Sequence, residues 1–220
     1  MVVFVTDGAV TSVEFHADLE VAIDRVELLA VDMPIGLPGD EGVVGAIAGV
    51  GRRADEVCRR LLGPRASSMF PAPPFAALAA MDYQQARAIS PSLTAQSFSL
   101  GKRILELREL VSRLGESVVE FHPEVTFRML AGEPLQHPKR SWNGQQQRRQ
   151  LLAQLGVEIA DVLPADVGSA CPDDVLDAAA GAVTAAAIAS GRCRVFGWDA
   201  DQQPPRGTRG LIWAPSEANP

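Results

Sequence analysis

The chain has 220 residues, of which 47% are hydrophobic and 21% are charged, and its formal net charge is −7. This composition is ordinary for a soluble globular protein, and a chain of this length can bury a core without disulfides or a structural metal. The acidic balance excludes a general nucleic-acid coat, which needs local positive charge, but it does not exclude a nuclease whose acidic site is neutralised by metal ions.

The cysteines and apolar segments indicate a cytoplasmic protein with no membrane association. Cys58, Cys171 and Cys193 are odd in number and lack Cys-x-x-Cys spacing, which disfavours a disulfide scaffold and a zinc ribbon. The first residues do not resemble a secretory signal. The longest apolar run, 175–189, is interrupted by Asp177 and is too short to cross a bilayer.

Periodicity and turn signals predict strands first and then helices alternating with strands. In chain order we expect strands at 2–5 and 13–15 joined by a turn at Asp7-Gly8, a short helix at 19–23, a buried strand at 27–31, helices at 52–62, 75–81, 83–89 and 94–114, a strand at 117–121, helices at 124–130, 145–155 and 172–190, and minor strands at 193–197 and 211–213.

This order predicts an α/β fold with a mixed sheet flanked by helices. We expect a single domain over residues 1–214, with a helical insertion around 40–115 and a loose tail at 215–220. The Pro-rich loop Ser67–Pro74 is either a dimer contact or a lid, so a homodimer stays open.

Acidic residues occur where sheet enzymes place catalysis. Asp32 ends a buried strand, Glu120 lies near the end of another, and Asp173, Asp174 and Asp177 open an apolar helix. Carboxylates that converge from separate elements repel each other, and a divalent cation relieves that repulsion. Such oxygen ligands suit Mg²⁺ or Mn²⁺, which activate water and stabilise the leaving oxygen in phosphodiester cleavage.

Each carboxylate also has a structural explanation. Asp32 alternatively caps the loop that follows it, Glu120 faces solvent on an edge strand, and Asp173 and Asp174 are ordinary helix-start residues. Asp177 is harder to explain in this way, because it lies one turn inside an apolar helix and needs a partner or a metal. His122 and its neighbour Glu124 lie close to Glu120, and His122 is either a base or a structural residue beside a proline.

Several segments resemble the domain-of-unknown-function 429 family, in family order from about Val2 to Trp213. They are VDMPIGLP at 31–38, the arginine-rich helix from Arg52-Arg53 to Arg59-Arg60, GPRASSMFPAPP at 63–74, VVEFHPEVTF at 118–127, PDDVLDA at 172–178 and RGLIW at 209–213. The resemblance implies a ribonuclease H-like fold and a metal-dependent hydrolase, a nuclease that acts transiently on nucleic acid.

Carried over residue by residue, the resemblance implies a catalytic and metal-binding set and a phosphate-binding set. The metal ligands are Asp32, Glu120 and one or more of Asp173, Asp174 and Asp177, with His122 and Glu124 in the same motif, and the phosphate contacts are Arg52, Arg53 and Lys102. Relatives begin with an aspartate-bearing strand, whereas Val2–Val5 matches the strand after it. We therefore expect either that the natural protein begins upstream of Met1, or that it lacks this first strand and the metal-binding aspartate on it.

Three functions remain open from the sequence. The first is a metal-dependent nuclease or related phosphodiesterase, which requires the carboxylates to converge. The second is a non-catalytic member that binds nucleic acid, a nucleotide or a protein through the same groove. The third is an enzyme of another class, such as a nucleotide phosphatase.

Overall fold

The computed structural model describes residues 1–6, 9–14, 16, 20–47, 51–167, 170–199 and 201–217. The protein is a mixed α/β structure that is 46% helical. The predicted turn at Asp7-Gly8, the residue Phe15 and the end of the predicted tail, 218–220, lie outside the described residues.

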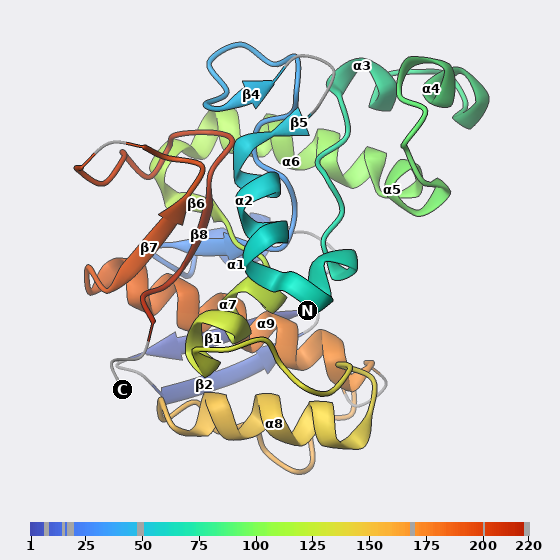
Figure 1. Ribbon diagram of the computed structural model, residues 1–220. Helices are drawn as coiled ribbons and strands as arrows, with labels where there is room; N and C mark the ends of the chain where they lie inside the picture. The colour runs from blue at the N-terminus through green and yellow to red at the C-terminus, as the bar shows by residue number, and fades with distance from the viewer. Residues whose placement is uncertain are drawn as a thin grey trace.

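The elements of the described chain follow the predicted order closely (Figure 1). The strands are β1 Val2–Thr6, β2 Ala9–Glu14, β3 Leu29–Val31, β4 Ala46–Ile47, β5 Gly51–Arg52, β6 Val118–Glu120, β7 Cys193–Phe196 and β8 Ile212–Pro215. The helices are α1 Glu20–Ile23, α2 Arg53–Leu62, α3 Phe75–Leu78, α4 Tyr83–Ile89, α5 Ala95–Ser99, α6 Gly101–Leu114, α7 Pro123–Ala131, α8 Trp142–Ala153 and α9 Pro172–Ala189, with short 3₁₀ turns at Gly63–Ser68 and Gly115–Ser117.

The central strands mix parallel and antiparallel pairing, as the sequence predicts. β3 and β6 are parallel, and β7 and β8 are antiparallel. A parallel bridge between Phe121 and Trp213 joins the end of β6 to β8. The antiparallel hairpin of β1 and β2 is a separate pair, and a large cavity lies between β1 and β3.

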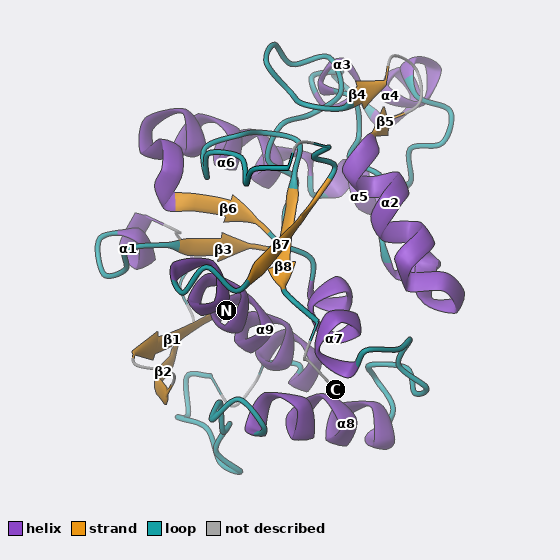
Figure 2. Cartoon of the chain, turned by 60° about the vertical axis from the view of Figure 1, so that its left-hand side comes forward, coloured by secondary structure: helices purple, strands orange, loops and turns teal. Residues whose placement is uncertain are grey.

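Helices cover both faces of the central strands, with α6 on one face and α9 on the other (Figure 2). Leu29 and Val31 pack against the apolar stripe of α6, whereas Ala30 packs towards α9. Side chains alternate between the two faces of a strand. The odd-numbered residues of β3 therefore pack against α6, and its even-numbered residue packs against α9.

The helix α9 forms because Pro172 suits its first turn and a long alanine-rich run follows with high helix propensity. Small side chains also allow α9 to lie close to the sheet. A Cβ atom on Gly181 would come within 2.8 Å of the Phe121 ring and 3.5 Å of the Ala30 carbonyl oxygen. Glycine at this position lets α9 pass directly over β3 and the end of β6.

Some boundaries differ from the predictions. The single helix predicted for 94–114 is two helices that meet at Leu100, with Thr94 capping the first through the Ser97 amide. α8 begins at Trp142, three residues before the predicted start, because the Ser141 hydroxyl caps it. The short strands β4 and β5 were not predicted, since two-residue strands carry no periodicity. Among the described helices, none has the length and apolar character needed to cross a membrane.

Candidate active site

An acidic cleft lies where the end of β3 meets the first turns of α9. Asp32 follows directly after β3, and Asp174 and Asp177 come from the start of α9. All three side chains line the same cavity, whose volume is about 2380 Å³. The structure therefore brings together carboxylates that are far apart in the sequence, as the convergence hypothesis requires for these residues.

Lys139 lies among these carboxylates. Its Nζ atom is 2.7 Å from Oδ2 of Asp177 and 3.5 Å from Oδ2 of Asp173. Arg140 adds a longer contact of 3.7 Å to Asp173. Figure 1 shows why this is possible, since the loop that carries Lys139 leads into α8 at the same end of the molecule where α9 begins.

Two acidic groups of the cleft, Asp32 and Asp177, hold their protons more tightly than ordinary aspartates. Asp32 is exposed to the solvent of the cavity, and the protein atoms around its carboxylate reduce its hydration, which raises its pKa to about 6 against the lowering effect of Lys139. Burial likewise raises the pKa of Asp177 to about 6, and the charges of Asp32 and Asp173 add to the rise while Lys139 opposes it. Asp32, Asp177 and Lys139 thus form one electrostatic unit.

His122 borders this unit at the start of α7. Burial lowers the pKa of its imidazole below the ordinary value, and the nearby charges of Asp177 and Glu124 oppose that change. The ring is therefore neutral at pH 7. Its Nδ1 atom is buried and has no hydrogen-bond partner within the described part of the chain.

Glu124 lies beside His122 but is engaged in an ion pair. Its Oε2 atom accepts a hydrogen bond of 2.7 Å from Nη2 of Arg148, and both residues are buried. Nη1 of Arg148 donates to the carbonyl oxygens of Gly144 at 2.9 Å and His137 at 3.4 Å. The pair joins α7 to α8 and holds the loop that carries Lys139.

Glu120 does not join the acidic cleft. It is the register partner of Val31 in the parallel pair of β3 and β6, so it lies on the face opposite to Asp32. Its two carboxylate oxygens each accept a hydrogen bond of 2.7 Å from Arg52, and Oε2 also accepts one of 2.6 Å from the Ile35 amide. The alternative that Glu120 faces solvent is wrong, because Glu120 is 5% exposed.

Arg52 is equally committed to this buried cluster. Besides Glu120, it donates to Asp55 at 2.5 Å and 3.2 Å and to the carbonyl oxygen of Gly36 at 3.2 Å. Burial raises the pKa of Glu120 to about 7, although Arg52 opposes the rise. The cluster links β6, α2 and the loop after β3, and Arg52 is 3% exposed, so it offers no free face to a phosphate.

The two remaining basic candidates are exposed and lie outside the cleft. Arg53 pairs with Asp199. Lys102 is 88% exposed and forms a 3.7 Å contact with Glu106 within α6. The structure does not bring either residue to Asp32 or to the start of α9.

Lys139 and Arg140 are adjacent basic residues that the sequence analysis does not include among the site candidates. The available signal was their position directly before Ser141, a residue type that caps helices, because this places both cations at a helix start. Nothing in the sequence indicates that the same end of the molecule holds the start of α9. That proximity comes from the packing of α8 against α9.

The donor set of the cleft fits a hard divalent cation in its chemistry. Asp32 and Asp177 supply carboxylate oxygens from two elements, and the buried Oδ1 atom of Asp177 has no hydrogen-bond partner among the described residues. Within those residues there is no group of three or more His, Cys, Asp or Glu side chains arranged to hold a metal. The fit therefore rests on Asp32 and Asp177, with Asp173 and Asp174 beside them.

Comparison with known proteins places the chain in a family. No curated protein and no solved structure matches it. The sequence profile of the DUF429 family, described as protein of unknown function, matches residues 1–202. Because this match covers most of the chain, the protein belongs to the DUF429 family.

Proposed function

We propose that the protein is a metal-dependent phosphodiesterase that cleaves nucleic acid, with its active site at the acidic cleft of Asp32, Asp177 and Lys139. The main support for this proposal is that Asp32 and Asp177 face one cavity from two separate elements, and that both have a pKa raised to about 6. Raised carboxylate pKa values in a cleft are typical of functional sites.

The cation of this proposal is Mg²⁺ or Mn²⁺, held by Asp32 and Asp177. When bound, it would supply Lewis-acid stabilisation to a phosphodiester and an activated water. The protein's own residues orient the site: Lys139 offsets the carboxylate charge, and neutral His122 lies next to Asp177 as a group able to accept or donate a proton.

The size of the cavity suits a polymeric substrate, and because its lining holds more acidic than basic side chains, an anionic polymer would need a bound cation there. Its volume of about 2380 Å³ is larger than the pockets that take small ligands. Four arginines lie on its lining: Arg25 pairs with Glu14 and Arg113 with Glu20, which leaves Arg103 and Arg192 as the candidates for phosphate contact. Arginine side chains contact phosphate groups without reading sequence, so this lining favours backbone contacts.

The same observations support a ribonuclease H-like arrangement as part of the proposal. A mixed central sheet with α6 on one face and α9 on the other is compatible with that fold. The acidic residue after a central strand and the acidic start of a packed helix are the positions that the family resemblance implied.

A second candidate is a binding protein without catalysis. It is favoured by Lys139, because its contacts with Asp177 and Asp173 already neutralise part of the acidic charge without a metal. In this case the arginines of the cavity would bind nucleic acid, and adding a divalent metal would not lead to cleavage of the bound nucleic acid.

A cleavage assay separates these functions. Purified protein is incubated with end-labelled single-stranded DNA, duplex DNA, RNA and an RNA–DNA hybrid, with Mg²⁺, Mn²⁺ or EDTA. The variants are D32N, D177N and the matched control E133Q, since Glu133 is exposed after α7. We expect metal-dependent cleavage of at least one substrate, reduced at least about 100-fold in D32N and D177N and unchanged in E133Q. Binding without cleavage would overturn the catalytic proposal in favour of the second candidate.

A further inference from the structure

The loop between α7 and α8 is built to hold one ammonium group at the acidic cleft. Lys139 contacts Asp177 and Asp173 through Nζ, and its charge also acts on Asp32. The side chain is half-buried, with 40% of it exposed. It therefore has solvent on one side, which gives the ammonium room to leave the carboxylates.

The backbone around Lys139 is held tightly. Arg148 bonds to the carbonyl of His137, and the Ser141 amide and hydroxyl both donate to the carbonyl of Pro138. A Cβ atom on Gly144 would meet that carbonyl oxygen at 1.9 Å, so only glycine allows the loop to lie against the start of α8. The backbone at Lys139 is thus anchored, so any loss of its contacts with Asp177 requires a movement of the side chain alone.

Lys139 occupies one carboxylate oxygen of Asp177 and leaves the other without a partner among the described residues. The Oδ2 atom of Asp177 accepts the hydrogen bond from Lys139, whereas its buried Oδ1 atom has no hydrogen-bond partner among the described residues. A divalent ion bound at this carboxylate would stand next to the ammonium. Two like charges at such short range repel each other, so both cannot be held fully at once.

We propose that Lys139 is the resident counter-cation of the cleft and competes with a divalent metal ion for Asp177. In the metal-free protein it stabilises the acidic start of α9, and on metal binding its ammonium moves away from Asp177. Lys139 is then a positioning residue that sets the metal affinity of the site. This inference rests on the proposed function, because it requires the cleft to bind a cation.

The test measures Mn²⁺ binding to the full chain by calorimetric titration and by the loss of the free-ion electron paramagnetic resonance signal. The variants are K139M, K139R, D177N and the matched control K102M, which removes an equal charge from an exposed lysine on α6. We expect Mn²⁺ to bind K139M about tenfold more tightly than the wild type. K139R and K102M should bind as the wild type does, and D177N should lose binding.

A second readout separates competition from a structural role. Without metal, K139M should melt at a lower temperature than K102M, because Asp177 and Asp173 have lost their partner, and saturating Mn²⁺ should remove that difference. Equal or weaker Mn²⁺ binding by K139M, with Asp177-dependent binding in the wild type, would overturn the competition and leave the proposed function standing. No Mn²⁺ binding by any variant would overturn both.

Discussion

Val31 and Glu120 are register partners in the parallel pair of β3 and β6, and this pairing directs Glu120 away from the face that carries Asp32. Glu120 instead shares a buried cluster with Arg52 and Asp55. Two acidic residues at neighbouring strand ends therefore have different roles, with Asp32 at the cleft and Glu120 in an internal ion cluster.

The first prediction concerns that cluster. Glu120→Gln leaves Asp55 as the one remaining acidic partner of buried Arg52 among the described residues, and removing one member of a buried ion pair usually costs about 3–5 kcal/mol. We expect the free energy of unfolding, measured by urea denaturation, to fall by this order. The Mn²⁺ affinity of the folded fraction should equal that of the wild type. A variant of normal stability that no longer binds Mn²⁺ would show that Glu120 belongs to the metal site after all.

The second prediction concerns the link between α7 and α8. Arg148→Met removes the partner of buried Glu124 and two carbonyl contacts, so we expect a loss of about 3–5 kcal/mol of unfolding free energy. The neighbouring residue supplies the control. Arg149 pairs with Asp161, which is 96% exposed, and Arg149→Met should cost less than about 1 kcal/mol.

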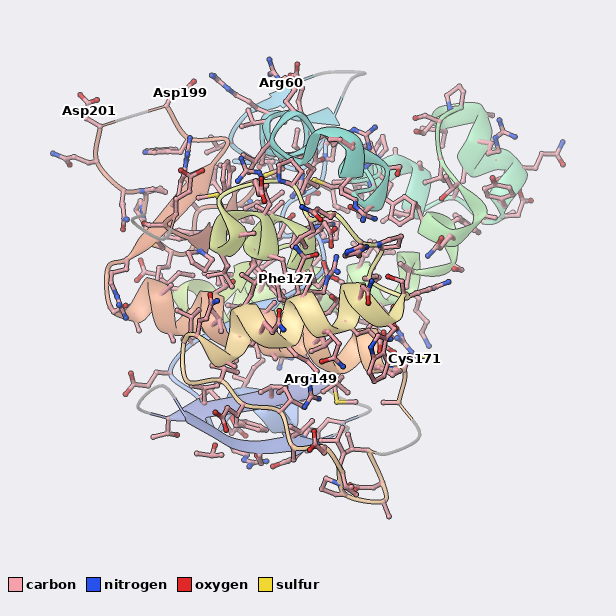
Figure 3. All side chains as sticks on the ribbon, turned by 60° about the horizontal axis from the view of Figure 1, so that its bottom comes forward. Arg60, Phe127, Arg149, Cys171, Asp199 and Asp201 are labelled. Carbon is pink, nitrogen blue, oxygen red and sulfur yellow. The ribbon has the colours of Figure 1, made fainter. Side chains whose placement is uncertain are left out.

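Figure 3 shows Arg149 on α8 and Phe127 on α7. The side chain of Phe127 belongs to a large apolar core cluster. The guanidinium of Arg148 lies 5.3 Å from the centre of the Phe127 ring. Equal losses in the Arg148 and Arg149 variants, both followed by urea denaturation, would contradict the assignment of Arg148 as the link between the helices.

The third prediction concerns pH. The pKa of Asp32 rises from 3.8 to about 6, so the folded protein binds this proton more tightly than the unfolded chain does. The free energy of unfolding should therefore fall as the pH rises from about 4 to about 6 and stay low above that. Asp32→Asn should reduce this fall.

At pH 7 the Asp32→Asn variant should be more stable than the wild type by about 1 kcal/mol, a value discounted because the side chain touches solvent. This corresponds to a rise in Tm of about 2–4 °C for a chain of this size. Glu133→Gln is the control and should follow the wild-type profile in calorimetric melts from pH 4 to pH 8. Coinciding profiles for Asp32→Asn and the wild type would refute the assignment.

The fourth prediction concerns the contact of α9 with the sheet. Gly181→Ala places a methyl group 2.8 Å from the ring of Phe121, which is buried, so the ring or the helix must shift and we expect a loss of about 1–3 kcal/mol. Gly101→Ala is the matched helical variant. Its only close contact would be with the flexible end of Leu78 at 3.1 Å, and the gain in helix propensity should make it neutral or stabilising. Thermal melts that rank the two variants in the opposite order would contradict this packing.

The sequence alone was sufficient to predict the class of fold and most of its elements. The helix α9 and the strand β3 were predicted nearly to their ends, because continuous apolar runs bounded by proline, glycine or acidic residues are local signals. Family membership also followed from the sequence, since the motifs at 31–38 and 118–127 are contiguous stretches and need no tertiary information to be read.

Only the tertiary structure decided which charged residues share a site. The register of β3 and β6 places Glu120 on the face covered by α6. A register shift of one residue would have placed Glu120 on the opposite face, beside Asp32. Register depends on pairing between distant segments, so the local sequence does not reveal it. The packing of α8 against α9 brings Lys139 to Asp177, 38 positions along the chain. Arg52 was predicted to contact phosphate, but in the structure it is paired with Glu120 and Asp55. Its burial and its partners depend on the packing of the whole molecule, which residue type alone does not give.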